Sequence, residues 1–421
     1  MELITKAPRG TADVLPPESE KWNKVIKTVR QVAFDFNLKE VRTPTFEHTE
    51  LFERGVGGTT DVVQKEMYTF NDKGGRSITL RPEGTASAVR AVLESGLYGG
   101  AMPLKLFYEI PCFRYEKPQA GRLREFHQFG VEIFGAKSVA ADLEVITLGD
   151  TVLKRLGLKN VLLSINSIGC KECRAKYKEA LIKYFSDYKD TLCETCLSRL
   201  EKNPLRILDC KSEICKSVNK DAPSILDYLC DGCKNDFNGL REKLDLIGID
   251  YVVDDRIVRG LDYYNGIVFE FSSKEIGAQS QLLAGGRYDG LASEIGGEEL
   301  AGLGFGMGIE RIIMVMEKQG LFEDISEKKD IFLANMGEKG LDIAAKLVFE
   351  LRNKGLSAEF DICGKGMKAQ LRYADKNGYR YTAVIGDNEI ETKTLKLKNM
   401  ETGESEEITF DGIYDAVVKG R

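Results

Sequence analysis

The segment Arg259-Gly260-Leu261-Asp262-Tyr263-Tyr264 joins a permanent cation to two adjacent phenols at the start of a β-branched strand. A guanidinium recognises phosphate or carboxylate through a planar fork of donors, and a phenol both donates and accepts hydrogen bonds. These side-chain types at one strand end suit a site that holds a polar, planar ligand beside a phosphate.

A second polar group follows a strand, where Glu83 and Thr85 come directly after Pro82. A carboxylate and a hydroxyl two residues apart, behind a proline that fixes the backbone, suit an ammonium group. The same residues are typical of an ordinary helix start, with Glu83 or Thr85 as its cap. The sequence leaves both interpretations open.

A strand–loop–strand unit carries the next candidates. Arg114 ends its first strand, and Gln128, Gly130 and Glu132 alternate along one face of its second strand. A polar face with room above it favours a pocket floor, and a solvent-facing side of the sheet is the alternative. The basic loop 117–124 suits a phosphate-rich partner, although a solvated turn would have the same composition.

Glycines at 302, 304, 306 and 308 alternate along a further strand, which leads into a helix that carries Arg311. A strand face without side chains lets a flat ligand such as a purine lie against the backbone. Close packing of the strand against a helix is the alternative. No Gly-Lys-Ser/Thr sequence follows, so the run is not a P-loop.

The surrounding periodicity predicts the elements that position these groups. We expect helices at 16–37, 139–156 and 174–189, and strands at 39–47, 67–70, 77–81, 104–112, 126–134, 251–253, 267–271 and 281–285. The charged stretch 317–329 reads as a linker. Beyond it, strands and helices alternate from 330 to 386, which indicates a small α/β domain.

The composition limits the class of protein. The 421 residues carry a net charge of −6, so a nucleic-acid site must be a local basic patch. The start of the chain has no secretory signal, and no apolar run reaches membrane-spanning length, so we expect a cytoplasmic protein without membrane contact. Only two histidines, His48 and His127, are present, which disfavours a histidine-centred triad or metal site.

Eight of the ten cysteines fall between about 165 and 245, in four close pairs. Two of the pairs have the CxxC form and a separation typical of zinc sites, which makes a structural Zn²⁺ site the candidate: Cys170, Cys173, Cys193 and Cys196. A second candidate set is Cys210, Cys215, Cys230 and Cys233. Free thiols used as small apolar residues are the alternative.

Together the motifs resemble class II aminoacyl-tRNA synthetases and, within them, the histidyl-tRNA synthetase family. Val41–Pro44, Phe113–Glu116 and Gly302–Arg311 resemble the three signature motifs of the class, the first of which forms a dimer. Arg259–Tyr264 and Ala284–Asp289 resemble the two histidine-specific motifs. The resemblance covers nearly the whole chain.

The resemblance implies an α+β fold. A class II synthetase-type antiparallel sheet flanked by helices would carry a helical Cys-rich insertion and a C-terminal α/β anticodon-binding domain. The implied boundaries are a catalytic core at 1–165 and 246–320, an insertion at 166–245 and an anticodon-binding domain at 329–421. A homodimer is implied as well.

The implied activity is the ATP-dependent conversion of L-histidine to histidyl-adenylate and its transfer to the 3′ end of tRNA(His). By resemblance, Arg114 and Arg259 are the catalytic residues that contact the α-phosphate. ATP would also contact Glu116 and Arg311, with Mg²⁺ bridging the phosphates.

The resemblance also implies a set of histidine-binding residues and a contact with tRNA. The histidine contacts would be Glu83, Thr85, Gln128, Glu132, Tyr263 and Tyr264. Gln119 and Arg122 would approach the tRNA acceptor end.

A non-catalytic histidine-binding paralogue that regulates histidine biosynthesis is the alternative function, and a nucleic-acid-binding module without ATP turnover is a third. The paralogue would be expected to lose the arginines of the site and the C-terminal domain. Arg114, Arg259, Arg311 and residues 330–421 are all present, which favours the enzyme.

Overall fold

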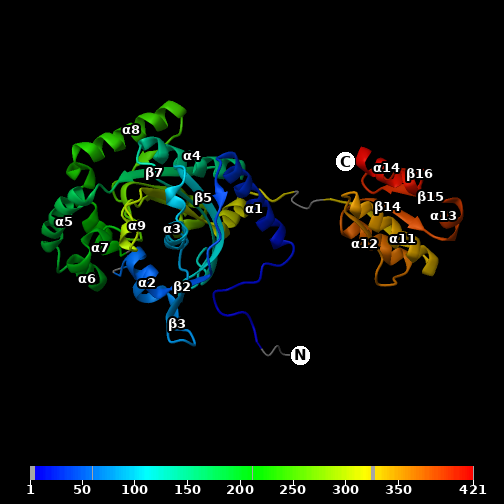
Figure 1. Cartoon of the computed structure of the whole chain (residues 1–421), viewed down its shortest axis with the longest axis horizontal. Helices are drawn as coiled ribbons and strands as arrows, with labels where there is room; N and C mark the ends of the chain where they lie inside the picture. Colours follow the sequence, from blue (N-terminus) through cyan, green and yellow to red (C-terminus); the bar gives the residue numbers. More distant parts are fainter. Residues whose placement is uncertain (1–4, 59, 211, 324–327, 421) are drawn as a thin grey trace. The chain divides into compact units, whose positions relative to one another are not determined.

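The structure is a computed structural model that describes residues 5–58, 60–210, 212–323 and 328–420 (Figure 1). The chain divides into two compact units, with the boundary after Glu323. The predicted linker 317–329 overlaps the end of the last helix of the first unit, and its residues 324–327 lie outside the described residues. Within the described ranges, no helix is long and apolar enough to cross a membrane.

The first unit contains a large sheet, a small sheet and their helices. Its strands are β1 (Lys39–Glu40), β2 (Phe46–His48), β3 (Tyr68–Asn71), β4 (Ser77–Leu80), β5 (Leu104–Phe113), β6 (Glu125–Phe134), β7 (Val161–Ser167), β8 (Val252–Val253), β9 (Asn265–Ser273), β10 (Gln281–Arg287) and β11 (Gly302–Gly308). Its α-helices are α1 (Glu18–Asp35), α2 (Thr49–Phe52), α3 (Thr85–Glu94), α4 (Val139–Arg155), α5 (Lys171–Ser186), α6 (Glu194–Lys202), α7 (Glu213–Asn219), α8 (Asp231–Ile247), α9 (Leu291–Glu294) and α10 (Ile309–Lys318).

The large sheet has the strand order β1-β5-β6-β11-β10-β9-β7-β8. The six strands from β5 to β7 pair antiparallel, as the resemblance implied, whereas the edge pairs β1–β5 and β7–β8 are parallel. The small sheet has the order β2-β4-β3. The fold class is therefore the expected α+β arrangement, with parallel pairing added only at the edges of the sheet.

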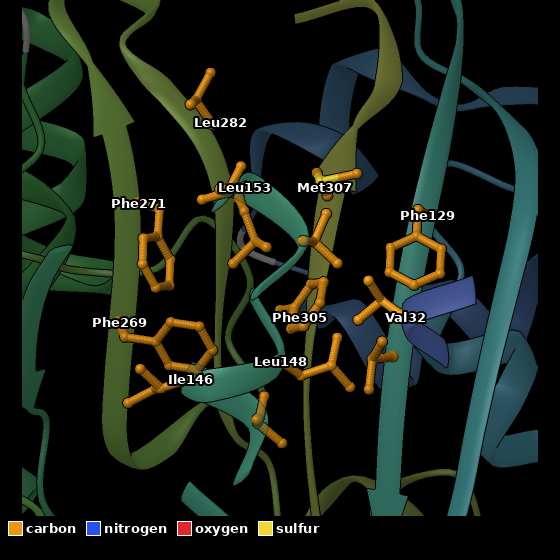
Figure 2. Close-up of a cluster of buried hydrophobic side chains, with 14 of the residues drawn as sticks. Val32, Phe129, Ile146, Leu148, Leu153, Phe269, Phe271, Leu282, Phe305 and Met307 are labelled. Carbon is orange, nitrogen blue, oxygen red and sulfur yellow. The ribbon is translucent and has the colours of Figure 1, made fainter. Parts of the chain in front are cut away.

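Helices α1 and α4 cover one face of the large sheet. Figure 2 shows Val32 of α1 and Leu148 of α4 directed at Phe129 and Phe305 on the central strands. On β6 the apolar residues Phe129, Val131 and Ile133 all belong to this core. Because side chains alternate along a strand, the polar residues between them face the opposite side, where the site lies.

Two predictions about the sheets are wrong in detail. The expected single strand 39–47 is two short strands, β1 and β2, in different sheets, because the segment Val41–Thr45 with its proline breaks the extended run. Strand β7 was not predicted, although Leu163 and Ile165 on it are buried in the core. Its sequence, VLLSINS, has no strict alternation because residues on both sides of β7 are covered.

Helices α5 to α8 occupy the region of the predicted insertion and gather at one side of the unit (Figure 1). Helices α5, α6 and α7 share a small hydrophobic core around Tyr177, Leu181, Phe185 and Leu200, whereas Phe237, Leu240 and Leu244 of α8 belong to the core of the large sheet. Helix α5 starts three residues before its predicted position, directly after Cys170.

Within residues 328–420 the second unit is a five-stranded sheet with four α-helices, and the alternation predicted at 330–386 is confirmed by β12, α11, β13, α12 and β14. Its elements are β12 (Lys329–Asn335), α11 (Gly337–Asn353), β13 (Ala358–Phe360), α12 (Met367–Lys376), β14 (Tyr379–Ile385), α13 (Asp387–Thr392), β15 (Thr394–Asn399), β16 (Ser405–Thr409) and α14 (Ile413–Lys419). The order is β13-β12-β14-β15-β16, with the first three strands parallel. The β15–β16 hairpin was missed because its outward residues are charged and only Leu395 and Leu397 are buried.

Candidate active site

A cavity of about 420 Å³ lies on the polar face of the large sheet and draws its walls from distant parts of the first unit. Of the predicted side chains, those that line it are Glu83, Thr85, Arg114, Glu116, Arg122, Gln128, Arg259, Tyr263, Tyr264 and Arg311. Glu132 and Gln119 are not among the lining residues. Neither His48 nor His127 lines it within the described chain, and His127 instead bonds Glu310 through Nδ1 at 3.0 Å.

Glu83 stands at one end of the cavity and also caps a helix. Its two carboxylate oxygens accept the backbone N–H groups of Thr85 and Ala86, each at 2.8 Å, at the start of α3. Burial raises the pKa of Glu83, and these two backbone hydrogen bonds act against that rise. The interpretation as a helix start is therefore confirmed. Because the same carboxylate also lines the cavity, binding of an ammonium group stays a prediction.

The two adjacent tyrosines stand beside this carboxylate. The hydroxyl of Tyr263 donates to Glu83 over 3.4 Å, and the rings of Tyr263 and Tyr264 lie 4.6 Å apart. Burial raises the pKa of Tyr263 well above its usual value, so its phenol stays a neutral donor at ordinary pH. The hydroxyl of Tyr263 thus points to Glu83, and its contact with histidine stays a prediction.

Glu132 lies below the cavity and is held by two further phenols that were not predicted as site residues. Its carboxylate accepts the hydroxyl of Tyr108 at 2.9 Å and the hydroxyl of Tyr288. Burial raises the pKa of Glu132 to about 8, while hydrogen bonds from Tyr288, Thr85 and Tyr108 lower it. A direct contact of Glu132 with a ligand stays a prediction.

The floor of the cavity depends on glycines in two neighbouring strands. Gly130 on β6 pairs with Gly306 on β11. A Cβ on Gly130 would come within 2.1 Å of the Tyr108 ring, whereas a Cβ on Gly306 would be 3.6 Å from the Gln128 amide. Of the four alternating glycines predicted as a floor, only Gly306 and Gly308 line the cavity.

The other two glycines of this strand lie away from the cavity lining. A Cβ on Gly302 would meet the Tyr288 ring at 2.3 Å, and one on Gly304 would meet the Val131 carbonyl at 2.0 Å. Close packing therefore requires glycine in this half of the strand, although the contacts are with Tyr288 and strand β6 and not with a helix, as the alternative interpretation had it.

Arg259 faces the opposite end of the cavity from Glu83. Its guanidinium lies 5.3 Å from the centre of the Tyr264 ring and 3.5 Å from Glu270. Its Nε is buried and has no hydrogen-bond partner among the residues that the structure describes. A buried donor without a partner is costly, so this guanidinium is arranged for an anion.

Arg114 lines the cavity directly after β5 and lies beside the segment that carries Glu83. Its Nε donates to the Pro82 carbonyl at 2.9 Å, its guanidinium stacks 5.2 Å above the Phe126 ring, and the nearest Glu116 oxygen is 3.9 Å away. These contacts fix the side chain without neutralising its charge. The guanidinium is left available to a phosphate.

Arg311 completes the arginine end of the cavity. Its Nε and Nη1 donate to the carbonyls of Gly121 and Gln281, at 3.0 and 2.9 Å. Burial lowers the pKa of Arg311, and the positive charge of Arg122 adds to that effect. Because Nε and Nη1 of Arg311 donate to uncharged carbonyls, these hydrogen bonds leave its positive charge to act in the cavity.

The loop 117–124 closes over this end. Gln119 and Arg122 form a tight backbone bridge with N–O distances of 3.0 and 2.9 Å, and Arg122 pairs with Glu116 at 2.8 Å. The loop is therefore ordered by its own contacts. The role of Gln119 and Arg122 toward a tRNA end stays a prediction.

Three acidic residues of the cavity were missed: Asp209, Glu270 and Glu310. Glu270 lies on β9 between the buried Phe269 and Phe271, so the strand alternation could have placed it on the site face. Asp209 comes from the Cys-rich region, and no sequence pattern marks it. Burial raises the pKa of Glu270, and Arg259 counters that rise.

The eight clustered cysteines group differently from the prediction. The structure brings together an α5–α8 cluster and an α6–α7 cluster: Cys170, Cys173, Cys230 and Cys233 in the first, and Cys193, Cys196, Cys210 and Cys215 in the second. The predicted set of Cys170, Cys173, Cys193 and Cys196 is therefore wrong as one site. Each CxxC pair opens a helix, and helix packing, not sequence order, decides which pairs meet.

The first cysteine of each predicted CxxC pair is acidic for a thiol. Hydrogen bonding from the backbone N–H of Cys173 lowers the pKa of Cys170 to about 7, and that of Cys196 lowers the pKa of Cys193 to about 7. Thiolate is the form that binds metal.

Comparison with known families agrees with this geometry. The family model described as Histidyl-tRNA synthetase matches residues 10–173 and 217–312, and the model described as Anticodon binding domain matches residues 330–420. The gap between the two matched segments falls within the Cys-rich helices.

Individual relatives match along nearly the whole chain. Proteins named histidine--tRNA ligase from Acetivibrio thermocellus and Caldanaerobacter subterraneus are both 54% identical to this chain, over 97% and 99% of its length and 98% and 100% of theirs. The crystal structure of apo histidyl-tRNA synthetase from S. aureus superimposes with a TM-score of 0.84 at 38% identity, covering 98% of this chain and 100% of that one. This chain belongs to the histidyl-tRNA synthetase family.

Proposed function

We propose that this protein activates L-histidine with ATP to form histidyl-adenylate and then transfers the histidyl group to the 3′ end of tRNA(His). One observation carries the proposal: a single cavity joins a carboxylate-and-phenol end to an arginine end across a glycine floor. An amino acid and a nucleotide phosphate need these two surfaces side by side.

The arginine end suits the chemistry of the first step. The histidine carboxylate is ionised at neutral pH, so it attacks the α-phosphorus of ATP without a general base, and pyrophosphate leaves. Arg114 and Arg259 stabilise the charge that develops on the α-phosphate, and Arg311 holds the nucleotide. This step therefore uses the fixed positive charges of the arginines and needs no histidine side chain as a general base.

Mg²⁺ fits the same end, because Glu116 and Glu270 present carboxylate oxygens among the arginines. When bound, the ion neutralises phosphate charge. Glu116 also holds Arg122 in place through its ion pair.

The other end suits the amino acid. Glu83, Thr85 and Gln128 offer acceptors to the α-ammonium group, and Tyr264 with Glu132 offers partners to the two ring nitrogens. A site with a buried partner for each nitrogen rejects isosteres strongly, because a missing hydrogen bond leaves a site group unpaired.

Further partners follow from the same proposal. The C-terminal unit matches an anticodon-binding domain and would read the tRNA anticodon, while the loop 117–124 meets the acceptor end. We also propose a cytoplasmic homodimer. Phe46 and Phe70 of the small sheet support an interface, with exposed fractions of 56% and 48%. Light scattering of the purified chain tests the dimer.

Histidine-dependent exchange of pyrophosphate into ATP tests the activity. We expect exchange with L-histidine and none with L-phenylalanine or L-glutamine, followed by charging of tRNA(His). Absence of exchange would contradict the proposal. Histidine binding without exchange would support the alternative, a regulatory paralogue, which the three site arginines and the matched anticodon-binding domain disfavour.

A further inference from the structure

The sulfur atoms of each cysteine cluster are spaced as ligands of one metal ion. All four Sγ atoms of a cluster lie within 4.8 Å of one another. In the α5–α8 cluster, the Sγ atom of Cys170 lies 3.5 Å from that of Cys173 and 4.0 Å from that of Cys230, and in the α6–α7 cluster the Sγ atoms of Cys193 and Cys210 are 3.8 Å apart. A tetrahedral Zn²⁺ with Zn–S bonds of about 2.3 Å separates its sulfurs by about 3.8 Å.

Other uses of the thiols fit less well. Disulfide bonds need sulfurs about 2.05 Å apart, and all eight of these cysteines are free thiols. Five of the eight are only half-buried, which is unlike cysteines that serve as small core residues. Four soft ligands in a tetrahedron select zinc among the common ions.

Each cluster joins elements that are far apart in sequence. The α5–α8 cluster links the N-terminus of α5 to the N-terminus of α8, and the Cys230 backbone N–H donates to Cys173 Sγ at 3.1 Å. The α6–α7 cluster links the start of α6 to α7 and to Cys210, next to the cavity residue Asp209. The metal ions would therefore hold together a helical region whose own hydrophobic core is small.

This helical region in turn holds the backbone of the segment Arg259–Tyr264. Arg174, in the first turn of α5, donates to the Tyr264 carbonyl at 3.1 Å. Arg206 donates to the Arg259 carbonyl at 3.1 Å, and Asn203 donates to Asp262 at 3.3 Å. Both ends of the segment are thus tied to helices that a cysteine cluster anchors.

We propose that each cluster binds one Zn²⁺ and that the two ions together position the Arg259–Tyr264 segment for catalysis. On binding, each site releases the protons of those thiols that are not already ionised, and no electron transfer is involved. The ligands do not touch substrate, so they are positioning residues. The proposed zinc sites do not depend on the proposed function, whereas the positioning role rests on it.

Counting zinc in paired variants tests the sites and their grouping. Full-length protein purified without chelator should contain two zinc ions per chain by atomic absorption. Cys170→Ser/Cys230→Ser, with both changes in one cluster, should lose one ion, and Cys170→Ser/Cys193→Ser, with one change in each, should lose both. The exposed Cys363→Ser is the matched control and should keep two.

Several outcomes would overturn the sites. The proposed sites would be contradicted by less than one zinc per chain or by iron in place of zinc. They would also be contradicted if Cys170→Ser/Cys230→Ser lost both ions and Cys170→Ser/Cys193→Ser lost only one. If the variants do not fold, the wild-type protein can still be tested for bound zinc. Titration of its thiols with a mercurial should release two zinc ions per chain, which a zinc-binding dye detects. Release of none would count against the proposal.

The positioning role has its own measurement. Loss of one cluster should speed amide hydrogen exchange at 256–264 while leaving β6 unchanged, and should lower kcat for pyrophosphate exchange by roughly 10–100-fold, as for other supporting-shell changes. Unchanged hydrogen exchange in a zinc-depleted variant would refute positioning. Absence of pyrophosphate exchange in the wild type would contradict the proposed function alone, since zinc content and hydrogen exchange remain measurable.

Discussion

The two ends of the cavity are built in different ways. At the Glu83 end, both carboxylates are fixed by a helix and the sheet: Glu83 caps α3, and Glu132 accepts hydrogen bonds from tyrosines on β5 and directly after β10. At the arginine end, Arg259 and Arg311 are held by loops, carbonyls and the Cys-rich helices. The amino-acid end is therefore preorganised by the sheet, whereas the phosphate end depends on segments that ligands and metal can order.

The largest effect should come from Arg259→Ala at the loop-held end. We expect the kcat/KM of pyrophosphate exchange to fall by about 100- to 1,000-fold, equivalent to about 2.7–4 kcal/mol of transition-state stabilisation, because a preorganised charge is removed. Arg256→Ala is the matched control, since Arg256 donates to Lys220 and Ala222 carbonyls and does not line the cavity. Equal losses in both variants would show that Arg259 acts only through the fold.

A smaller effect should appear at the boundary between the two ends, in Tyr264→Phe. Loss of this hydroxyl should raise the KM for histidine by about 5- to 150-fold, the cost of about 1–3 kcal/mol for an unpaired polar partner. The KM for ATP should stay nearly constant, because the phenyl ring still lies under Arg259. Tyr264→Leu removes the ring as well, and steady-state kinetics should then show both KM values rising. If Tyr264→Phe raised the KM for histidine and the KM for ATP equally, the separate roles of the two ends would be contradicted.

Substitution of the paired glycines Gly130 and Gly306 should affect stability at one position and function at the other. Gly130→Ala forces a Cβ into the Tyr108 ring, so it should lower the free energy of unfolding by about 1–3 kcal/mol. Gly306→Ala has space, so its stability should match the wild type while ATP use declines. Thermal melts and the KM for ATP measure the two effects. A destabilised Gly306→Ala protein with normal ATP use would contradict this assignment.

The smallest effect concerns the buried Glu132. Because its pKa is raised from 4.5 to about 8, the native protein keeps a proton that the unfolded chain releases, and stability from this group falls as pH rises through that window. Glu132→Gln should flatten the fall, so the midpoint of thermal unfolding should change less between pH 5 and pH 8 than in the wild type. Parallel pH profiles would mean that Glu132 is ionised throughout.

Sequence patterns were informative where the residues of a single strand or helix form the pattern by themselves. The alternation of Gln128, Gly130 and Glu132 placed three residues on one face, and periodicity located nearly all long helices. The motifs also identified ten of the cavity residues, because Arg, Tyr and Glu at strand ends are costly unless a site uses them.

What the sequence did not reveal depends on contacts between distant elements. Tyr108 looks like an ordinary strand aromatic, and Tyr288 was noted only as part of the motif Ala284–Asp289. Only the antiparallel pairing of β5, β6, β11 and β10 brings both hydroxyls to Glu132. The cysteine grouping failed for the same reason, since proximity along the chain does not decide which helix N-termini meet. Asp209 had no signal because it lies outside any periodic element.

Strand β11 is synthesised long after β6, the strand with which it pairs in the large sheet. It pairs with β6 on one side and β10 on the other, although residues 135–301 separate it from β6 in the chain. At about 5–20 residues per second, the ribosome exposes the edge of β6 for roughly ten seconds or longer before its neighbour exists. The cavity floor is thus among the last parts of the catalytic unit to form, and the newborn chain carries an unpaired strand edge that chaperones must shield from other chains.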